Sequence, residues 1–279
     1  MEEKSFLGRS PKGFHRVAYT AWGNPSIRPP VICVHGLTRN GRDFDYLASA
    51  LEADAQLYCP DIVGRGRSDW LADPNDYNYS QYLADMTALL ARTGASDVDW
   101  VGTSMGGVLG MFLAAETDTP IRRLVINDIG PSVSLLGLKR IGAYVGLTPE
   151  FSTLAEAEKH MREIYAGFGE LSDEQWRHLA RFGTRELPNG RLTQAYDPAI
   201  AKAFLSVDED VDFWEVYDRI RCPVLLIHGL NSDILTPQIA EQMTWRGPKA
   251  ELIEVPKTGH APALMDLTQI AIIAEFLRR

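Results

Sequence analysis

The sequence predicts an α/β protein with a mostly parallel central sheet, helices on both faces of that sheet, and an inserted helical segment. Short apolar strands alternate with helix-forming stretches through the first half of the chain. Several of these strands are continuous apolar runs, which is typical of parallel strands buried on both faces. The alternation stops over residues 131–212 and then resumes. We therefore expect a core domain of residues 1–130 and 213–279, interrupted by a helical cap of residues 131–212.

The elements of the expected core follow one another in a regular order. The first is a hairpin with strands at Lys4–Leu7 and Arg16–Trp22. Further strands are expected at Val31–Val34, Leu57–Cys59, Val98–Val101, Leu124–Asn127, Val224–Ile227 and Leu252–Val255. Helices are expected near Phe44–Leu51 and Tyr82–Arg92, from Gly107 through Ala115, and at Leu267–Leu277. Because parallel strands end at one edge of their sheet, the loops after these strands should form the rim of an active site.

The expected cap is rich in helix formers and aromatic residues. Helical patterns cover Leu154–Tyr165, Glu174–Phe182 and Pro198–Leu205, with a Pro-Asn-Gly turn at residues 188–190. Aromatic side chains of such a cap either line a substrate pocket or form the cap's own core. The residues chosen as substrate-binding candidates are Trp176, Tyr144 and Phe182, and the other aromatic candidates are Phe151, Tyr165, Phe168, Tyr196 and Trp214.

The segment around Ser104 carries the most specific chemical signal. An apolar strand runs into Gly102-Thr103-Ser104-Met105-Gly106, a G-x-S-x-G turn, and a helix-forming run follows. The two glycines avoid collisions with the neighbouring strand and helix, so the turn can expose the Ser104 hydroxyl as a nucleophile. The Met105 N–H then lies in the first helical turn, where an unpaired donor favours developing negative charge.

Three further segments, each just after an expected strand, carry residues that could join Ser104 in one site. His35-Gly36-Leu37 ends the first buried strand, and the sharp exit at Gly36 would aim the Leu37 N–H toward Ser104. Asp233 lies just past the strand Val224–Ile227. It is either a polar residue of the site at this edge of the sheet or a cap of the helix that follows. His260 follows the last strand in a Gly-His pair.

Together with the G-x-S-x-G turn, these segments resemble the α/β-hydrolase superfamily in its serine-nucleophile branch. The resemblance implies a catalytic triad of Ser104, Asp233 and His260, in the chain order Ser, Asp, His. It also implies an oxyanion hole formed by the backbone N–H groups of Leu37 and Met105.

Some polar residues near the expected site leave alternatives open. Asp128 ends the strand Leu124–Asn127 and is the alternative triad acid, because some members of the superfamily take the acid from this strand. His35 reads as a structural histidine rather than the general base. The loop Pro60–Ser68, with Asp61, resembles the family's P-D-x-x-G-x-G-x-S motif and is assigned to the scaffold.

Composition limits the class of partner. The chain has 279 residues, 45% of them hydrophobic, and a net charge of −9 at pH 7, which disfavours nucleic acid and anionic membranes. There is no apolar run long enough for a membrane span and no apolar signal core after Met1. The cysteines Cys33, Cys59 and Cys222 read as reduced thiols, which predicts a cytoplasmic protein. Oligomeric state is left open.

The expected activity is hydrolysis of a small-molecule carboxylic ester through an acyl-enzyme on Ser104, with no metal and no organic cofactor. A C–C bond hydrolase of the meta-cleavage-product type is the alternative, and arginines such as Arg181 and Arg185 pointing into the pocket would favour it. An alternative of a different class is a small-ligand-binding module that has kept a vestigial triad.

Overall fold

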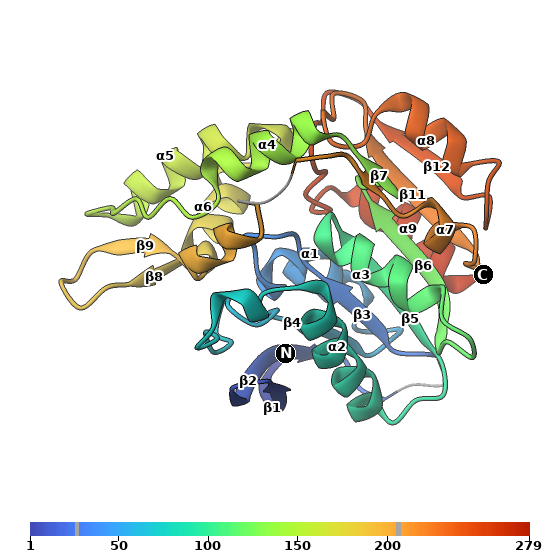
Figure 1. Ribbon diagram of the computed structural model, residues 1–279, viewed down its shortest axis with the longest axis horizontal. Helices are drawn as coiled ribbons and strands as arrows, with labels where there is room; N and C mark the ends of the chain where they lie inside the picture. Colours follow the sequence, from blue (N-terminus) through green and yellow to red (C-terminus); the bar gives the residue numbers. More distant parts are fainter. Residues whose placement is uncertain (26–27, 205–207) are drawn as a thin grey trace.

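The computed structural model describes residues 1–25, 28–204 and 208–279. In these ranges the main sheet contains eight strands in the order β1-β2-β4-β3-β5-β6-β11-β12 (Figure 1). Their bounds are β1 Glu2–Ser10, β2 Gly13–Trp22, β3 Val31–Val34, β4 Leu57–Pro60, β5 Val98–Thr103, β6 Ile121–Asn127, β11 Val224–Gly229 and β12 Glu251–Val255. β1 pairs antiparallel with β2, and β2 pairs antiparallel with β4. The remaining neighbours are parallel, which confirms the predicted mostly parallel sheet.

The parallel strands are buried on both faces, and their alternate residues enter two different cores. In β3, Ile32 and Val34 belong to one hydrophobic cluster, whereas Val31 and Cys33 belong to another. Because side chains alternate across a strand, the two clusters lie on opposite faces of the sheet. This explains why the strands read as continuous apolar runs.

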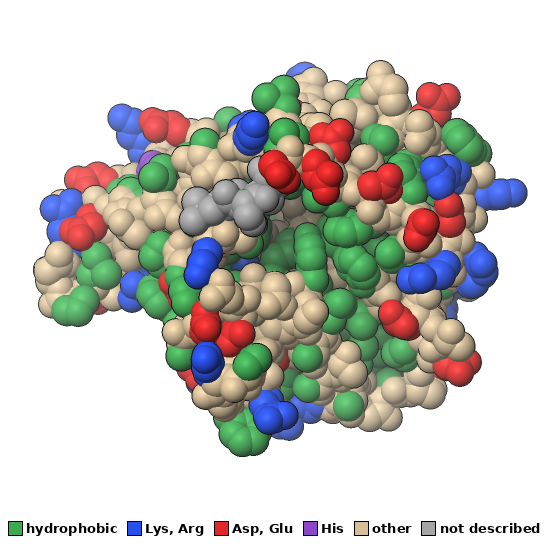
Figure 2. Space-filling view, viewed as in Figure 1, with side chains coloured by type: hydrophobic (Ala, Val, Ile, Leu, Met, Phe, Trp, Pro, Cys, Tyr) green, Lys and Arg blue, Asp and Glu red, His purple; other side chains and the backbone are tan. Residues whose placement is uncertain are grey.

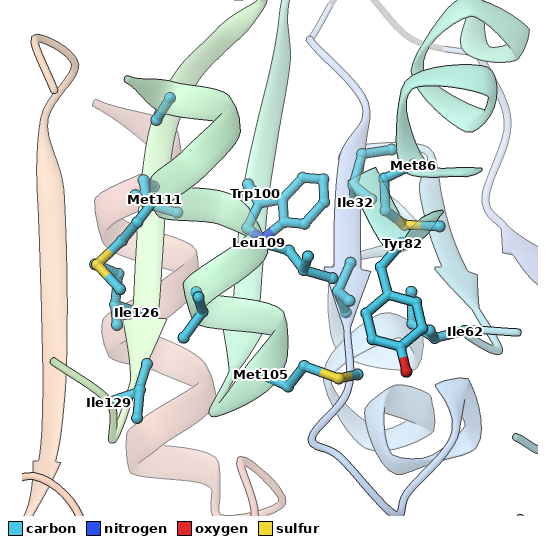
Figure 3. Close-up of a cluster of buried hydrophobic side chains, with 14 of the residues drawn as sticks. Ile32, Ile62, Tyr82, Met86, Trp100, Met105, Leu109, Met111, Ile126 and Ile129 are labelled. Atoms are coloured by element: carbon cyan, nitrogen blue, oxygen red, sulfur yellow. The ribbon is translucent and has the colours of Figure 1, made fainter. Parts of the chain in front are cut away.

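Helices cover each face. On the first face α2 (Tyr79–Thr93) and α3 (Met105–Ala114) pack through residues such as Met86 and Leu109. Figure 3 shows this packing around Trp100 of β5. On the opposite face lie α1 (Asp45–Leu51) and α9 (Leu267–Arg278). Two shorter helices, α7 (Trp214–Tyr217) and α8 (Pro237–Met243), flank β11 in sequence. No helix in the described parts of the chain is long and apolar enough to cross a membrane.

The segment between β6 and β11, residues 131–212, is called the insertion below. It contains β7 Ser132–Val133, α4 Leu135–Tyr144, α5 Leu154–Ile164, α6 Asp173–Gly183, β8 Thr184–Glu186, β9 Leu192–Gln194 and β10 Val211–Asp212, with short 3-10 helices at Ala166–Phe168 and Pro198–Phe204. Its two ends lie side by side, because β7 pairs antiparallel with β10. In Figure 1 the insertion extends from one edge of the core.

The insertion differs from the sequence prediction in three places. α4 was not predicted, because Gly137 and Gly142 weaken its helical signal; Ser134 caps it by accepting a hydrogen bond from the Gly137 N–H. The predicted turn at residues 188–190 joins the strands of a hairpin, β8 and β9. The predicted helix Pro198–Leu205 is a 3-10 helix over Pro198–Phe204, and Leu205 lies outside the described residues.

Candidate active site

Ser104 lies at the sharp turn between β5 and α3, in a backbone conformation unusual for a residue with a side chain. Its φ is 51° and its ψ is −117°. The turn is held by hydrogen bonds from the Ser104 N–H to the Asn127 carbonyl, 2.9 Å, and from the Gly107 N–H to the Ser104 carbonyl, 2.8 Å. A strained conformation held by the surrounding structure is common at functional sites.

The glycines on either side of Ser104 are required by close backbone contacts. A Cβ at Gly102 would collide with the Gly106 backbone in α3, and a Cβ at Gly106 would collide with the Val34 carbonyl in β3. The sequence predicted both collisions, one with the helix and one with a neighbouring strand.

His260 connects the serine to a carboxylate. Its Nε2 lies 2.9 Å from the Ser104 Oγ, and its Nδ1 lies 2.9 Å from an oxygen of Asp128. An ionised carboxylate only accepts hydrogen bonds, so Nδ1 carries the proton and Nε2 is free to accept from the serine hydroxyl. The loop that holds His260 is tied to β6 by a 2.8 Å hydrogen bond from the Asn127 amide to the Pro262 carbonyl.

Asp128 is fully buried at the end of β6 and is surrounded by donors. One carboxylate oxygen accepts from the Gly229 N–H at 2.7 Å, and the other accepts from the Ser232 hydroxyl at 2.6 Å as well as from His260. These donors stabilise the charged carboxylate away from water.

The structure corrects the predicted position of the acid. Asp233, the residue assigned to the triad from the sequence, is about half exposed and forms an ion pair with Arg140 of the insertion. β6 lies next to β5 in the sheet, whereas β11 is one strand further from Ser104. The end of β11 and the loop that follows it therefore reach the site with the Gly229 N–H and the Ser232 hydroxyl, which donate to the Asp128 carboxylate, and Asp233 faces outward.

The two predicted oxyanion-hole residues lie beside Ser104. Leu37 and Ser104 line the same two cavities, and a Cβ built on Gly36 would lie 3.6 Å from the Ser104 Cβ. Met105 is the first residue of α3, where a helix N–H has no acceptor within its own helix. An oxygen held by both amides would be favoured when it is negatively charged.

His35 and Asp61 support this arrangement from behind. His35 is buried, and its Nε2 accepts from the Ile62 N–H while its Nδ1 donates to the Gly36 carbonyl. Burial lowers the pKa of His35 to about 4, so this histidine is neutral at physiological pH. Its contacts make it part of the loop scaffold, as the sequence suggested.

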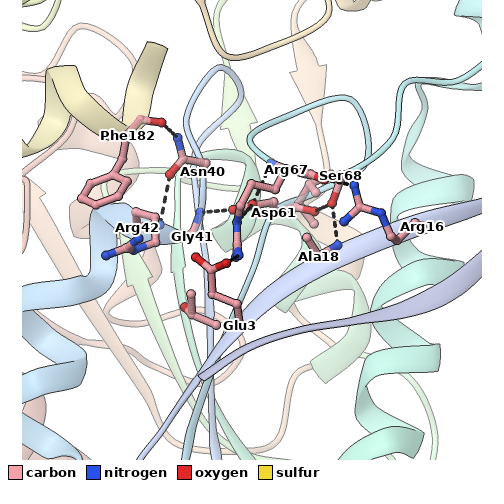
Figure 4. Close-up of polar contacts among 12 residues, drawn as sticks. Glu3, Arg16, Ala18, Asn40, Gly41, Arg42, Asp61, Arg67, Ser68 and Phe182 are labelled. Carbon is pink, nitrogen blue, oxygen red and sulfur yellow. Dashed lines mark hydrogen bonds and ion pairs between the residues drawn. The ribbon is translucent and has the colours of Figure 1, made fainter. Parts of the chain in front are cut away.

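Figure 4 shows the buried network around Asp61. The Asp61 carboxylate accepts from the Gly41 N–H at 2.8 Å and from the Arg67 N–H at 2.9 Å. Nearby, the Asn40 side chain donates to the Phe182 carbonyl of α6 at 2.8 Å. Burial raises the pKa of Asp61. The loop after β4 is therefore fastened to the loop after β3 and, through it, to the insertion.

Two cavities meet at Ser104. One, of about 310 Å³, is apolar and lies between α2, α3 and the insertion, with Val108, Ile141 and Phe213 among its lining residues. The other, of about 60 Å³, contains His260, Thr38, Arg140 and Tyr144. Figure 2 shows a hollow with hydrophobic side chains between the insertion and the core.

Among the three chosen substrate-binding residues, only Tyr144 lines either cavity. Trp176 is buried among Met161, Leu179 and Met265 in a core of the insertion. The Phe182 ring lies under the Arg42 guanidinium, 3.7 Å from the ring centre. The predictions for Trp176 and Phe182 were therefore wrong, because Trp176 is buried in that core and the half-buried Phe182 packs against Arg42. Tyr165 and Phe168, which were candidates, do line the smaller cavity.

The sequence analysis missed several residues that support the candidate active site. Ser232 and Asn127 were not singled out as site residues, and Arg65 was assigned to the scaffold with the rest of its loop. Polar residues at the ends of β6 and β11 gave a weak signal for the first two, but nothing in the sequence shows which loops meet. In the described ranges, no group of three His, Cys, Asp or Glu residues is arranged to hold a metal ion.

Comparison with known proteins gives a consistent result. Residues 29–266 match the family described as alpha/beta hydrolase fold. A 3-hydroxybutyrate-oligomer hydrolase from Cupriavidus necator is 44% identical, and the alignment covers 96% of this chain and 94% of that protein. The structure of an alpha/beta hydrolase from Novosphingobium aromaticivorans is 38% identical, with a TM-score of 0.89 and coverage of 99% of this chain and 98% of that one.

A more distant structure, E-2-(acetamidomethylene)succinate hydrolase, shares the fold at 20% identity, with a TM-score of 0.83 and full coverage of both chains. The family match, the relatives and the site geometry agree with one another. The chain therefore belongs to the α/β-hydrolase fold family, and it is a hydrolase of that type.

Proposed function

We propose that this protein hydrolyses small-molecule carboxylic esters through an acyl-enzyme on Ser104. The observation that carries the proposal is the continuous hydrogen-bonded chain from the Ser104 Oγ through His260 to the buried Asp128. A nucleophile, a base and a group that orients the base are the parts that acyl transfer requires.

The proposed reaction has two steps. His260 Nε2 takes the Ser104 proton as the Oγ attacks the ester carbonyl carbon, and the carbonyl oxygen becomes negative between the Leu37 and Met105 amides. His260 then gives the proton to the departing alcohol as the ester C–O bond breaks. A water molecule, deprotonated by His260, attacks the acyl-enzyme and releases the acid and free Ser104. As proposed, the chemistry uses only protein groups and water.

Short oligomers of 3-hydroxybutyrate are the proposed substrates. The main support is the 44% identity, over nearly the full length of both proteins, to a 3-hydroxybutyrate-oligomer hydrolase. The two cavities beside Ser104 offer an apolar space for the methyl-bearing chain on one side and, on the other, a smaller space that includes polar groups such as Thr38 and Arg140. An ester that spans both would place its carbonyl carbon near Ser104.

The arginines near the site give the C–C hydrolase alternative little support. Arg181 and Arg185 stack on Phe182 and Trp70 and line neither of the two cavities at Ser104. The arginines that do line the smaller cavity, Arg39 and Arg140, are paired with Asp43 and Asp233. A carboxylate of a keto acid would have to compete with these aspartates for the arginine charge.

We also propose a cytoplasmic location and a small-molecule acyl substrate, with neither nucleic acid nor membrane as a partner. The three cysteines Cys33, Cys59 and Cys222 are free thiols, which fits a reducing compartment. The net charge of −9 gives no attraction to polyanions.

The test is a set of initial-rate assays on wild type and Ser104→Ala. The substrates are p-nitrophenyl acetate, butyrate and octanoate, the dimer and trimer of 3-hydroxybutyrate, and a ring-fission keto acid. We expect ester turnover by wild type and its loss in Ser104→Ala, with unchanged folding by circular dichroism. Turnover of the keto acid alone would replace the proposal by the C–C hydrolase. Binding of esters without turnover would favour the ligand-binding alternative.

A further inference from the structure

A fully buried arginine, Arg65, contacts both residues that are proposed to form the oxyanion hole. It belongs to the loop after β4, and its side chain is completely enclosed. Its Nε donates to the Leu37 carbonyl at 2.8 Å, and one terminal nitrogen lies 3.8 Å from the Met105 sulfur. One side chain thus contacts both residues whose N–H groups would hold the oxyanion.

Among the described residues, the Arg65 guanidinium donates hydrogen bonds only to uncharged groups. Besides Leu37, its guanidinium donates to the Val63 carbonyl at 2.8 Å and to the Tyr82 hydroxyl at 2.9 Å. In Figure 3 the Met105 sulfur and the Tyr82 hydroxyl, on α3 and α2, point toward the same region. None of the ion pairs found among the described residues includes Arg65.

Enclosing a charge without a charged partner costs considerable free energy. This guanidinium therefore differs from Arg39 and Arg42, which are each paired with a nearby aspartate. A buried positive charge close to a site where negative charge develops is stabilising in the transition state and unfavourable for stability in the resting protein. This trade-off is typical of groups retained for function.

The loop of Arg65 is also fastened to the insertion. Arg65 forms an isolated β-bridge with Tyr196, the Gly66 N–H donates to the Ala195 carbonyl, and the Asp197 N–H donates to the Gly64 carbonyl, each of these two at 2.8 Å. The Tyr77 hydroxyl donates to the Asp197 carboxylate at 2.6 Å. The backbone of the loop that carries Arg65 is therefore fastened to the insertion.

We propose that Arg65 is a positioning residue for the oxyanion hole. It fixes the backbone at Leu37 by holding that residue's carbonyl, and it places a positive charge behind the amides of Leu37 and Met105. The inference rests on the proposed ester hydrolysis, because it assigns Arg65 to the oxyanion of that reaction. Its effect should fall on kcat, where the oxyanion forms, and not on the binding of the neutral ester.

The test compares Arg65→Gln and Arg65→Lys with Arg67→Gln as the matched control. Arg67 lies in the same loop and carries the same charge, but its ion pairs are with Glu3 and Asp61. The readouts are kcat and KM for p-nitrophenyl butyrate and the affinity for a trifluoromethyl ketone, which adds to a serine as a charged tetrahedral mimic. Melting temperature is measured for every variant.

We expect Arg65→Gln to lower kcat about tenfold, which is less than the roughly 10² to 10³ for losing a direct oxyanion donor. KM should stay within about twofold, and the affinity for the ketone should fall by the same factor as kcat. Arg65→Lys keeps the charge but loses the planar guanidinium with its several N–H donors, so its kcat should lie between those of wild type and Arg65→Gln. Arg67→Gln should lose stability while keeping kcat.

Several results would overturn the inference. They are a wild-type kcat in folded Arg65→Gln, an equal loss of kcat in Arg67→Gln, or unchanged affinity for the ketone. If Arg65→Gln does not fold, a wild-type kcat and ketone affinity in Arg65→Lys would also overturn it. Ser104→Ala separates the two proposals: if it retains turnover, the ester mechanism fails and the role of Arg65 fails with it, whereas an inactive Ser104→Ala beside a fully active Arg65→Gln rejects Arg65 alone.

Discussion

The loops after β6 and β11 each carry an aspartate near the carboxyl edge of the sheet, and the two aspartates have opposite surroundings. Asp128 is enclosed and accepts hydrogen bonds from Gly229, Ser232 and His260. Asp233, about half exposed, pairs with Arg140. The comparison shows that a position just after a strand does not by itself identify a triad acid, because the order of the strands in the sheet determines which loop lies beside the histidine.

The largest expected effect tests the Asp128 side of this comparison. Asp128→Asn should lower kcat for ester hydrolysis by about 10³ to 10⁴, because the amide no longer holds His260 in the required tautomer or stabilises the imidazolium. Steady-state kinetics with p-nitrophenyl butyrate would measure it. A loss of less than tenfold would show that Asp128 is not the acid.

Acid pH should lower the free energy of unfolding. This limits the pH range in which the variants of Asp128 and Asp233 can be compared. The pKa of His35 is about 4 in the folded protein and 6.5 as its ordinary value. Between these values the unfolded chain takes up a proton that the folded protein does not. The contribution of the neutral His35 to the free energy of unfolding is therefore fully present above pH 6.5 and is lost as the pH falls toward 4. The loss is up to about 3 kcal/mol.

Urea unfolding of wild type and His35→Gln at several pH values would test this prediction. Glutamine offers one acceptor and one donor group but does not titrate, so the free energy of unfolding of His35→Gln should fall less over this range. Equal pH slopes in the two proteins would contradict the assignment. Kinetic comparisons of the aspartates belong above pH 6.5.

Ser232 connects the two loops, and its removal should give an intermediate effect. Ser232→Ala deletes a donor to the Asp128 carboxylate, and a hydrogen bond to a charged group contributes about 1.5–3 kcal/mol. Only part of this free energy differs between the ground state and the transition state, so we expect kcat to fall roughly tenfold. Ser232→Thr, which keeps the hydroxyl, serves as the control. Equal rates for the alanine and threonine variants would remove Ser232 from the site.

The smallest effect is expected on the Asp233 side. Asp233→Asn should change kcat by less than about threefold, and it should lower the free energy of unfolding by no more than about 1 kcal/mol, as for other exposed ion pairs. Arg140→Gln should have a similar effect on stability. A loss of kcat in Asp233→Asn close to that in Asp128→Asn would reverse the comparison.

The parts of the site that could be predicted from the sequence are those with local signals. The G-x-S-x-G turn and the Gly-His pair each identify one residue from its immediate neighbours, and the structure brings Ser104 and His260 into hydrogen-bond contact. The alternation of strands and helices likewise predicted the sheet and the insertion, although α4 was hidden by its glycines.

The choice between Asp128 and Asp233 depends on the order of strands in the sheet, which periodicity does not reveal. The same holds for Trp176 and Phe182, since a helical pattern does not show which side of a helix faces a cavity and which faces a neighbouring helix. Arg65 was assigned to the scaffold with the rest of its loop, because its proposed role depends on contacts with residues 28 and 40 positions away in the chain.

The central claim, acyl transfer to Ser104, is tested most directly by trapping the intermediate. Wild type and Ser104→Ala would be mixed with p-nitrophenyl butyrate, quenched in acid within milliseconds, digested and analysed by mass spectrometry. We expect a butyryl group on the peptide that contains Ser104 in wild type and none in Ser104→Ala. Rapid turnover by wild type with no acylated peptide, or acylation at another residue, would contradict it.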